Sequence, residues 1–340
     1  MTHTEIDTAA QMAPPSAPGG EEGGGLLSRE RLAQLGPLIA LLLVCIFFTT
    51  QSDRFLSGQN FSLIFQQVMV IGTLAIGQTL IILTAGIDLA CGTIMALGSI
   101  VMTKLAVQSG VPPFLALLLG IATCAAFGLL HGLLVTRIGL PPFIVTLGTF
   151  SICLALTHIY SKDETISGLP TLMTKLGEGF SIGSTRVTYG SVVCLGLFVA
   201  TWFALSQTAW GRHVYTLGDN AEAARLMGIP VRRKLLMVYV VAAAFYGIAA
   251  LLLISRTNVG DPNAGQTENL EAITAVVLGG TSLFGGRGTV IGTLIGAIII
   301  GVLRNGLVLM GVASIYQVLI TGILVILAVS VDQLARRRAT

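Results

Sequence analysis

Two histidines and one aspartate are the residues of this chain best suited to chemistry within its long apolar segments. His131 and His158 could serve as general bases or metal ligands, but the sequence places no acidic partner beside either of them within its segment. We therefore expect both to be packed, hydrogen-bonding residues. Asp88 stands at the start of another apolar segment, where it could contact a substrate or cap the helix that follows, and capping is the simpler expectation.

The chain has no motif that would hold a nucleotide. The pattern GxxxxGK[ST] is missing, and the glycine-rich residues 279–288 do not end in the lysine and hydroxyl that bind phosphates and magnesium. We therefore expect no catalytic residue, metal or cofactor on this chain. Few charged residues lie deep in the apolar segments, which argues against an ion-coupled pump. Any uphill transport would then draw its energy from another subunit.

The amino-acid composition indicates whether this chain folds in water or in a membrane. Hydrophobic residues make up 54% of the 340 residues, charged residues make up 10%, and the mean hydropathy is +0.86. Soluble domains carry roughly 25% charged residues, so this is an integral membrane protein. The apolar runs are too long and too rich in Leu, Ala and Gly for barrel strands. The sequence predicts an all-α fold with about ten transmembrane helices, near residues 36–52, 61–83, 88–107, 114–136, 142–160, 188–206, 235–255, 271–285, 288–304 and 312–332.

The distribution of Lys and Arg predicts that both termini are cytoplasmic, because basic residues concentrate in cytoplasmic loops. The net charge of +3 therefore reflects topology and does not indicate a nucleic-acid partner. Residues 1–28 are rich in Pro and Gly and are predicted to be a disordered cytoplasmic tail. Residues 29–335 form the predicted transmembrane domain, and residues 336–340 a basic cytoplasmic C-terminus.

One polar island, residues 211–234, interrupts the apolar sequence and falls on the cytoplasmic side. Within this predicted cytoplasmic loop (residues 207–234), Glu222, Ala223, Ala224 and Arg225 precede Gly228-Ile229-Pro230, which ends a short helix. The alanines would allow close approach to a groove in a partner, and Glu222 and Arg225 could form polar contacts at its rim. The island is thus predicted to be a docking surface; the alternative is a solvated loop that only anchors the topology.

An internal similarity suggests two related halves, about residues 61–160 and 235–331. Residues 85–93 resemble residues 279–289, and each segment joins one apolar run to the next. Chance similarity between glycine-rich turns is the alternative. Three glycines, Gly288, Gly292 and Gly296, recur at four-residue spacing and predict a helix face open to close packing, either within the chain or against a second subunit. The residues assigned to hairpins or packing are Gly86, Asp88, Gly280, Gly285, Gly286, Gly288, Gly292 and Gly296.

Four motifs in order resemble the permease subunit of ribose-type bacterial ABC sugar importers. They are residues 81–89 (ILTAGIDL within them), residues 146–149 (TLGT), residues 218–229 (GDNAEAARLMGI) and residues 277–286 (VLGGTSLFGG). The resemblance runs from about Pro37 to Asp332 and leaves the tail outside. It implies the ABC importer permease fold in a bacterial inner membrane, two permease copies or close paralogues, two cytoplasmic ATPase subunits that carry ATP and magnesium, and a periplasmic sugar-binding protein.

The resemblance also implies roles for residues. Residues 219–228 are similar to the coupling helix that docks in the ATPase, and the residues assigned to this role are Gly218, Asp219, Asn220, Glu222, Ala223, Ala224, Arg225, Gly228 and Ile229. Uncharged polar residues in the spans could line a path for a monosaccharide or polyol, although for each residue taken singly an interhelical hydrogen bond is the simpler expectation. They are Gln67, Thr146, Thr149, Asn305 and Gln317.

Residues 161–188 and 256–270 are predicted periplasmic segments that could contact the binding protein through Asp163, Glu164, Asp261 and Glu268. Two other functions stay open at this point. One is an ion-coupled secondary transporter that works alone. The other is a permease for branched-chain amino acids, which the sugar-type motifs at residues 86–89 and 279–286 disfavour.

Overall fold

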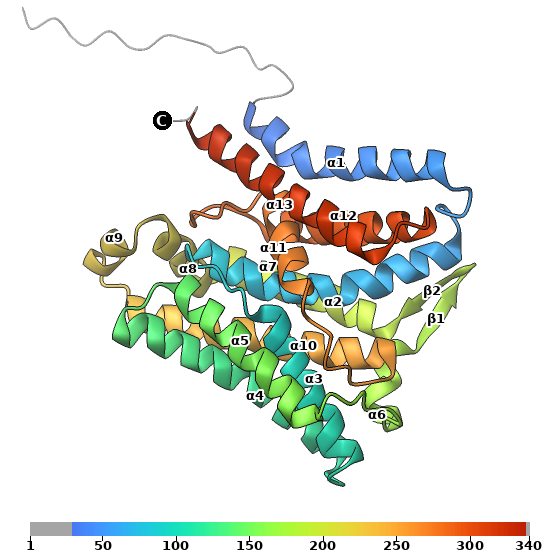
Figure 1. The fold of residues 1–340 in the computed structure, drawn as a ribbon. Coiled ribbons are helices and arrows are strands. Elements are labelled where there is room, and N and C mark those ends of the chain that lie inside the picture. The colour runs from blue at the N-terminus through green and yellow to red at the C-terminus, as the bar shows by residue number, and fades with distance from the viewer. Residues whose placement is uncertain (1–28, 338–340) are drawn as a thin grey trace, which may run out of the picture. The chain divides into compact units, whose positions relative to one another are not determined.

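The long apolar segments fold as helices, as expected where a bilayer offers the backbone no hydrogen-bond partners. The computed structural model describes residues 29–337, so the predicted tail at residues 1–28 and the last three residues of the basic C-terminus lie outside the described residues. The elements shown in Figure 1 are α1 (Arg29–Gln51), α2 (Gly58–Leu83), α3 (Cys91–Val107), α4 (Pro113–Leu133), the π-helix η1 (Leu134–Ile138), α5 (Pro142–Ser161), α6 (Thr171–Thr174), the 3-10 helix η2 (Lys175–Gly177), β1 (Gly179–Ile182), β2 (Thr185–Thr188), α7 (Tyr189–Gln207), α8 (Ala209–Asp219), α9 (Ala221–Leu226), α10 (Val231–Thr257), α11 (Glu268–Leu278), α12 (Val290–Leu309) and α13 (Ser314–Arg337).

The chain divides into two units, one up to Ala33 and one from Gln34 onward. Only five residues of the first unit are described, and they form the start of α1. All contacts discussed below lie within the second unit.

Six helical segments of the described chain are long and apolar enough to cross a membrane. They are Gly58–Leu83, Pro113–Ile138, Pro142–Ser161, Tyr189–Gln207, Val231–Thr257 and Val290–Leu309. Three shorter apolar helices are Gly36–Gln51, Cys91–Val107 and Ser314–Leu327. The prediction of a polytopic, mainly helical membrane protein is therefore confirmed. The count of ten spans and the plan of two related halves stay predictions.

The core is built around α2 and α10, which pack against each other. α10 also packs on α3 and α4, and Tyr239 and Tyr246 on α10 are among the largest fully buried side chains. Small residues permit this approach: a Cβ at Gly77 of α2 would lie 2.8 Å from the carbonyl oxygen of Ala242, and one at Gly132 of α4 would lie 3.0 Å from the Cα of Leu236. Gly77 and Gly132 thus set how closely α2 and α4 approach α10.

Several elements differ from the sequence-based expectations. Residues 271–285 do not form one span, because α11 ends at Leu278 and Gly280 follows in a left-handed conformation with φ +83°. α3 begins at Cys91 rather than at residue 88. A small antiparallel hairpin, β1–β2, interrupts the all-α pattern and pairs Gly179 with Thr188. Finally, residues 207–234, predicted as a cytoplasmic loop with one short helix, contain a second helix, α8, that the sequence did not predict.

The glycine face of α12 packs inside the chain. A Cβ at Gly292 would overlap the carbonyl oxygen of Gly279, and one at Gly296 would overlap that of Ala275, so α12 lies against the backbone of α11 and the residues after it. Gly288 is not on this face, because α12 begins at Val290; Gly288 has φ +150° and packs on Thr281. Of the two alternatives for this face, packing within the chain is the one observed.

Candidate coupling site and polar cavities

The polar island folds as two short helices with a sharp corner between them. Thr208 caps α8, its hydroxyl accepting the amide of Gly211 at 3.2 Å, and Asn220 caps α9, its Oδ1 accepting the amide of Ala223 at 2.9 Å. Gly228 ends the second helix with φ +81°, and the Ile229 amide returns to the Ala224 carbonyl at 3.0 Å. A left-handed residue followed by such a bond is a common helix stop, as expected from Gly228-Ile229-Pro230.

The outer surface of α9 combines an ion pair with exposed apolar side chains. The Arg225 guanidinium donates to both carboxylate oxygens of Glu222, at 3.1 Å from Nε and 2.5 Å from Nη2. This hydrogen bond, together with the positive charge, lowers the pKa of Glu222. Next to the pair, Leu226 is 78% exposed and Met227 is 65% exposed. Leu226 and Met227 were missed as candidate contact residues, although two large apolar residues in a polar island were the available signal.

The structure corrects the expected role of one alanine. Ala224 is fully buried against the rest of the chain, so it cannot face a partner groove, whereas Ala223 is only partly buried. The large side chains that α9 and the residue after it leave exposed are Glu222, Arg225, Leu226 and Met227.

The end of α8 is joined by backbone contacts to both glycine-rich hairpins, residues 84–90 and 279–289. The Gly286 amide donates to the Leu83 carbonyl at 3.0 Å, and a Cβ at Gly218 would overlap that same carbonyl oxygen. A Cβ at Gly285 would lie 2.8 Å from both the Ala85 nitrogen and the Gly218 oxygen. We call this meeting point of Leu83, Ala85, Gly218, Gly285 and Gly286 the three-way junction.

A side-chain contact supports the three-way junction from α8. The Tyr215 hydroxyl donates to the Gly288 carbonyl at 3.0 Å, and burial raises the pKa of Tyr215. Gly86 lies just outside the junction, where its Cβ position would be 2.9 Å from the Tyr239 hydroxyl. No atom lies within 4 Å of a Cβ placed at Gly280, so glycine is favoured there only by its positive φ of +83°.

Asp88 is not the helix cap that the sequence suggested. α3 begins later, and the Asp88 carboxylate accepts the amide of Ala90 at 2.8 Å. Its other oxygen lies 3.6 Å from Nδ1 of His131, and the Gln78 side chain donates to the Asp88 carbonyl. The expectation that His131 lacks an acidic neighbour was therefore wrong, because the fold brings Asp88 to it from a distant segment. The expectation that His131 forms hydrogen bonds was wrong too, since neither ring nitrogen has a hydrogen-bond partner among the described residues.

The residues predicted to line a substrate path are scattered. Thr146 and Thr149 are buried on α5 and donate to carbonyls, Thr146 to Ile87 at 3.2 Å and Thr149 to Val145 at 2.9 Å. Gln67 on α2 and Asn305 on α12 each keep a buried side-chain oxygen without a hydrogen-bond partner. These four residues do not share one of the described cavities.

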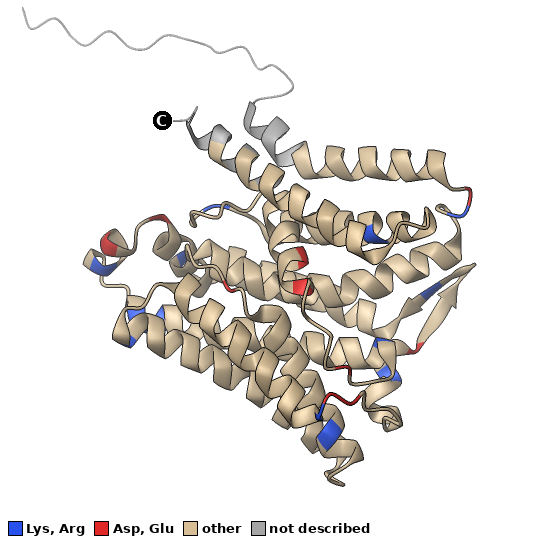
Figure 2. Ribbon diagram, viewed as in Figure 1, with Lys and Arg blue, Asp and Glu red and all other residues tan. Residues whose placement is uncertain are grey.

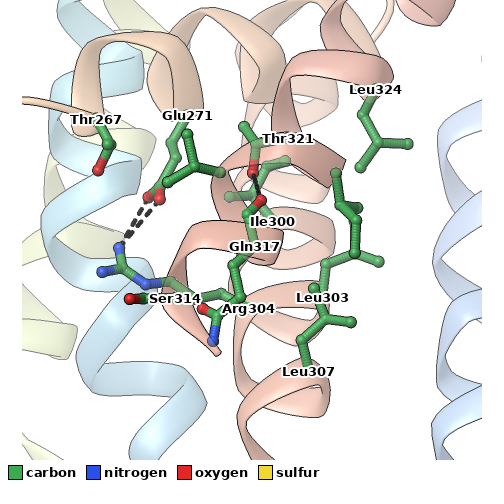
Figure 3. Close-up of a pocket in the computed structure, with 12 residues that line it drawn as sticks. Thr267, Glu271, Ile300, Leu303, Arg304, Leu307, Ser314, Gln317, Thr321 and Leu324 are labelled. Carbon is green, nitrogen blue, oxygen red and sulfur yellow. Dashed lines mark hydrogen bonds and ion pairs between the residues drawn. The ribbon is translucent and has the colours of Figure 1, made fainter. Parts of the chain in front are cut away.

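Gln317 lines a cavity of about 260 Å³ formed by α11, α12 and α13 (Figure 3). Glu271 and Arg304 also line it, and Nη1 of Arg304 lies 3.1 and 3.0 Å from the two carboxylate oxygens of Glu271. The Gln317 amide donates to the Val312 carbonyl at 2.9 Å. Carboxylate, guanidinium and amide groups around one small cavity can hydrogen-bond a hydroxyl-rich solute, with Leu303 and Leu307 as apolar walls.

The two predicted periplasmic segments lie side by side. Ile166 and Gly260 exchange both backbone hydrogen bonds, at 2.8 and 2.9 Å, and thereby join residues 161–188 to residues 256–270. Asp163 is exposed and lies 2.5 Å from Nδ1 of His158, so His158 too has the acidic partner that we did not expect. The three other candidates are the exposed Glu164 and the partly buried Asp261 and Glu268.

Comparison with known proteins gives one family and many relatives. Residues 60–329 match the family described as "Branched-chain amino acid transport system / permease component". The chain is 44% identical over 309 residues to a fructose import permease of Rhizobium meliloti, which covers 89% of this chain and 86% of the relative. It is 40% identical over 304 residues to a ribose import permease of Bacillus subtilis, covering 89% and 93%, and 37% identical over 296 residues to a ribose import permease of Escherichia coli, covering 87% and 92%.

Proposed function

Because the chain belongs to the family of bacterial ABC import permeases, on the ribose-type sugar branch, we propose that it forms the membrane path of an ATP-driven monosaccharide importer. The family is a transport family and not an enzyme family, and its members are multi-pass inner-membrane proteins. The proposed solute is a ribose-like pentose, a hexose or a related polyol. Ribose and fructose are the solutes named for the relatives, which supports a sugar over a branched-chain amino acid.

The proposed assembly has the parts expected of such an importer. Two permease copies, or this chain and a close paralogue, would form the core with ten spans each, in two related halves and with both termini in the cytoplasm. A separate ATPase would bind ATP and magnesium, so this chain would need no cofactor of its own. A periplasmic sugar-binding protein would deliver the solute to residues 161–188 and 256–270, whose joining by Ile166 and Gly260 supports a single docking area.

The observation that carries the coupling role is the connection between the exposed surface of α9 and the three-way junction. Leu226 and Met227 would insert into a groove of the ATPase, and the Glu222–Arg225 pair would fix the polar rim. Only Asn220 separates α9 from α8, and Gly218 at the end of α8 contacts both hairpins. Displacement of α9 by the ATPase would therefore reach the hairpins at the ends of α2 and α11, rather than being absorbed by a loose loop.

A charge placed on the exposed tip of α9 tests this role. The double variant Leu226→Asp/Met227→Asp is expected to lower solute-stimulated ATPase activity and uptake at least tenfold in liposomes that contain the permease, its ATPase and its binding protein, because apolar contact area is lost and charges are desolvated. The matched control is Leu56→Asp, which changes a 60% exposed residue in the turn before α2, outside α9 and outside residues 161–188 and 256–270, and is expected to keep ATPase association and uptake. Normal association and uptake by the double variant would contradict the coupling role of α9.

A further inference from the structure

A basic pocket lies where η1, which continues α4, meets the start of α10, the helix that follows α9 in the sequence. Its volume is about 730 Å³, and its lining residues are Thr136, Arg137, Arg232, Arg233, Leu236 and Met237. Figure 2 shows Lys and Arg gathered at this end of the two helices. The proposed function does not use this pocket, and no lining residue carries a negative charge.

The three arginines of the pocket have no acidic side chain beside them to balance their positive charge. Arg232 and Arg233 lie in the first turn of the 27-residue helix α10, which has no acidic residue in that turn and no side-chain cap. Cations there oppose the helix dipole, whose positive end is at the N-terminus. Arg137 adds a third guanidinium from η1, and among residues 29–337 no ion pair involves Arg137, Arg232 or Arg233. An anion in this pocket would meet three guanidinium groups that form no ion pair among the described residues, and it would lie at the positive end of the α10 dipole.

The pocket lies at a membrane boundary and has apolar walls. Arg137 stands at the end of the membrane-crossing segment Pro113–Ile138, and Arg232 and Arg233 stand at the start of the segment Val231–Thr257. Leu236 and the exposed Met237 line the same pocket one turn further along α10. A ligand that matches both the arginines and the apolar walls has an anionic headgroup at the membrane boundary and hydrocarbon chains beside the helices.

We propose that this pocket binds the headgroup of an anionic phospholipid. Guanidinium groups hold phosphate oxygens through paired hydrogen bonds, and basic pockets between membrane helices suit anionic lipid headgroups. The acyl chains would lie along Leu236, Met237 and the exposed Ile138. A soluble phosphate would gain nothing from this apolar side, and the charge pattern therefore favours a lipid.

Thermal unfolding of the purified full-length permease in a neutral detergent tests the proposal. Phosphatidylglycerol is expected to raise the unfolding midpoint at lower concentration than phosphatidylcholine with the same chains. Each arginine contributes about 1 kcal/mol to such binding, so the triple variant Arg137→Gln/Arg232→Gln/Arg233→Gln is expected to bind phosphatidylglycerol about a hundredfold more weakly. The matched control, Lys162→Gln/Lys175→Gln/Arg186→Gln, removes three exposed charges elsewhere and is expected to bind as the unmodified permease does.

Each other outcome has a defined meaning. Equal effects of the two lipids, or an unchanged response in the triple variant, would overturn the proposal. Stabilisation of the same size by inorganic phosphate alone would reassign the pocket to a free anion. A triple variant that keeps its lipid response but no longer associates with the ATPase would reassign the arginines to that partner. If the triple variant does not fold, Arg137→Gln alone is expected to weaken phosphatidylglycerol binding about fivefold, and an unchanged affinity would overturn the proposal.

Discussion

At the scale of single residues, Asp88 and His131 form a polar site enclosed by the protein. Asp88 is 1% exposed and His131 is 0% exposed, and their side chains approach to 3.6 Å. The His131 ring meets the Tyr239 ring edge-on, with centroids 6.1 Å apart. A buried carboxylate is stable only where partners compensate its charge. His131 therefore serves Asp88 as a fixed polar neighbour that links α4 to the hairpin before α3.

Removing His131 is expected to destabilise the permease more than its size suggests. His131→Leu would leave the buried side chain of Asp88 without its polar ring neighbour, and a buried polar group that loses such a neighbour typically costs about 1–3 kcal/mol of stability. The unfolding midpoint of the purified variant in detergent is expected to fall clearly below that of the unmodified protein. Asp88→Asn should lower it less, because the amide carries no net charge.

The double variant separates a pair effect from a simple loss of packing. His131→Leu combined with Asp88→Asn is expected to be less destabilised than the sum of the two single variants, by about 1 kcal/mol or more. Strictly additive midpoints would show that Asp88 and His131 act independently and would contradict the pairing.

At the scale of elements, α8 is held between two hairpins that belong to different parts of the sequence. Gly218 meets the Leu83 carbonyl at the end of α2, and Gly286 gives its amide to the same oxygen. Gly285, with φ +85°, also contacts Gly218. Because these contacts are between backbone atoms, they leave little room for α8 to slide without moving its neighbours. The three-way junction behaves as one mechanical element.

A methyl group at the junction is expected to disturb it. In Gly218→Ala the new Cβ would overlap the Leu83 carbonyl oxygen, so α8 or the end of α2 must shift, at a cost of about 1–3 kcal/mol. Solute-stimulated ATPase activity in liposomes is expected to fall, while membrane insertion persists. The matched control is Gly196→Ala on α7, where no atom lies within 4 Å of the new Cβ and better helix propensity should leave activity and stability intact. Full activity of Gly218→Ala would show that the junction is not rigid.

Helix bounds were predicted well where local residues such as proline or charged side chains mark them. They were predicted poorly where tertiary packing determines them. The prediction of residues 142–160 matches α5 closely, because Pro141 and Pro142 mark the start of the helix and the charged Lys162 and Asp163 follow its end. α11 was predicted too long, since an interval without charge does not reveal the stop at Gly279 and Gly280. α8 was missed because it is only 11 residues long and lacks the long apolar run by which the other helices were predicted. The pairing of Asp88 with His131 depends on tertiary contacts, so no local pattern could show it.

At the scale of the whole molecule, the permease alone should be inactive. Its sequence contains no nucleotide-binding pattern, and few charged residues lie within its apolar segments, so we expect neither ATP nor an ion gradient to act directly on this chain. Liposomes containing only the permease are expected to show no accumulation of ribose or fructose under a proton or sodium gradient. Uptake should appear when the ATPase, ATP and the binding protein are added. Gradient-driven accumulation by the permease alone would instead identify a secondary transporter.

The three-way junction also limits how this permease can be recombined with its relatives. A transplanted segment at residues 207–234 would bring its own α8, but the surfaces that receive α8 are the backbone near Leu83 and Ala85 and the turn at Gly285 and Gly286. A chimaera that exchanges only this segment would thus place α8 of one protein against the hairpins of another, and their backbone contacts would not be matched. A chimaera that exchanges α9 alone would keep Gly218 and all residues before it. We therefore expect it to preserve the three-way junction while changing the surface proposed to meet the ATPase.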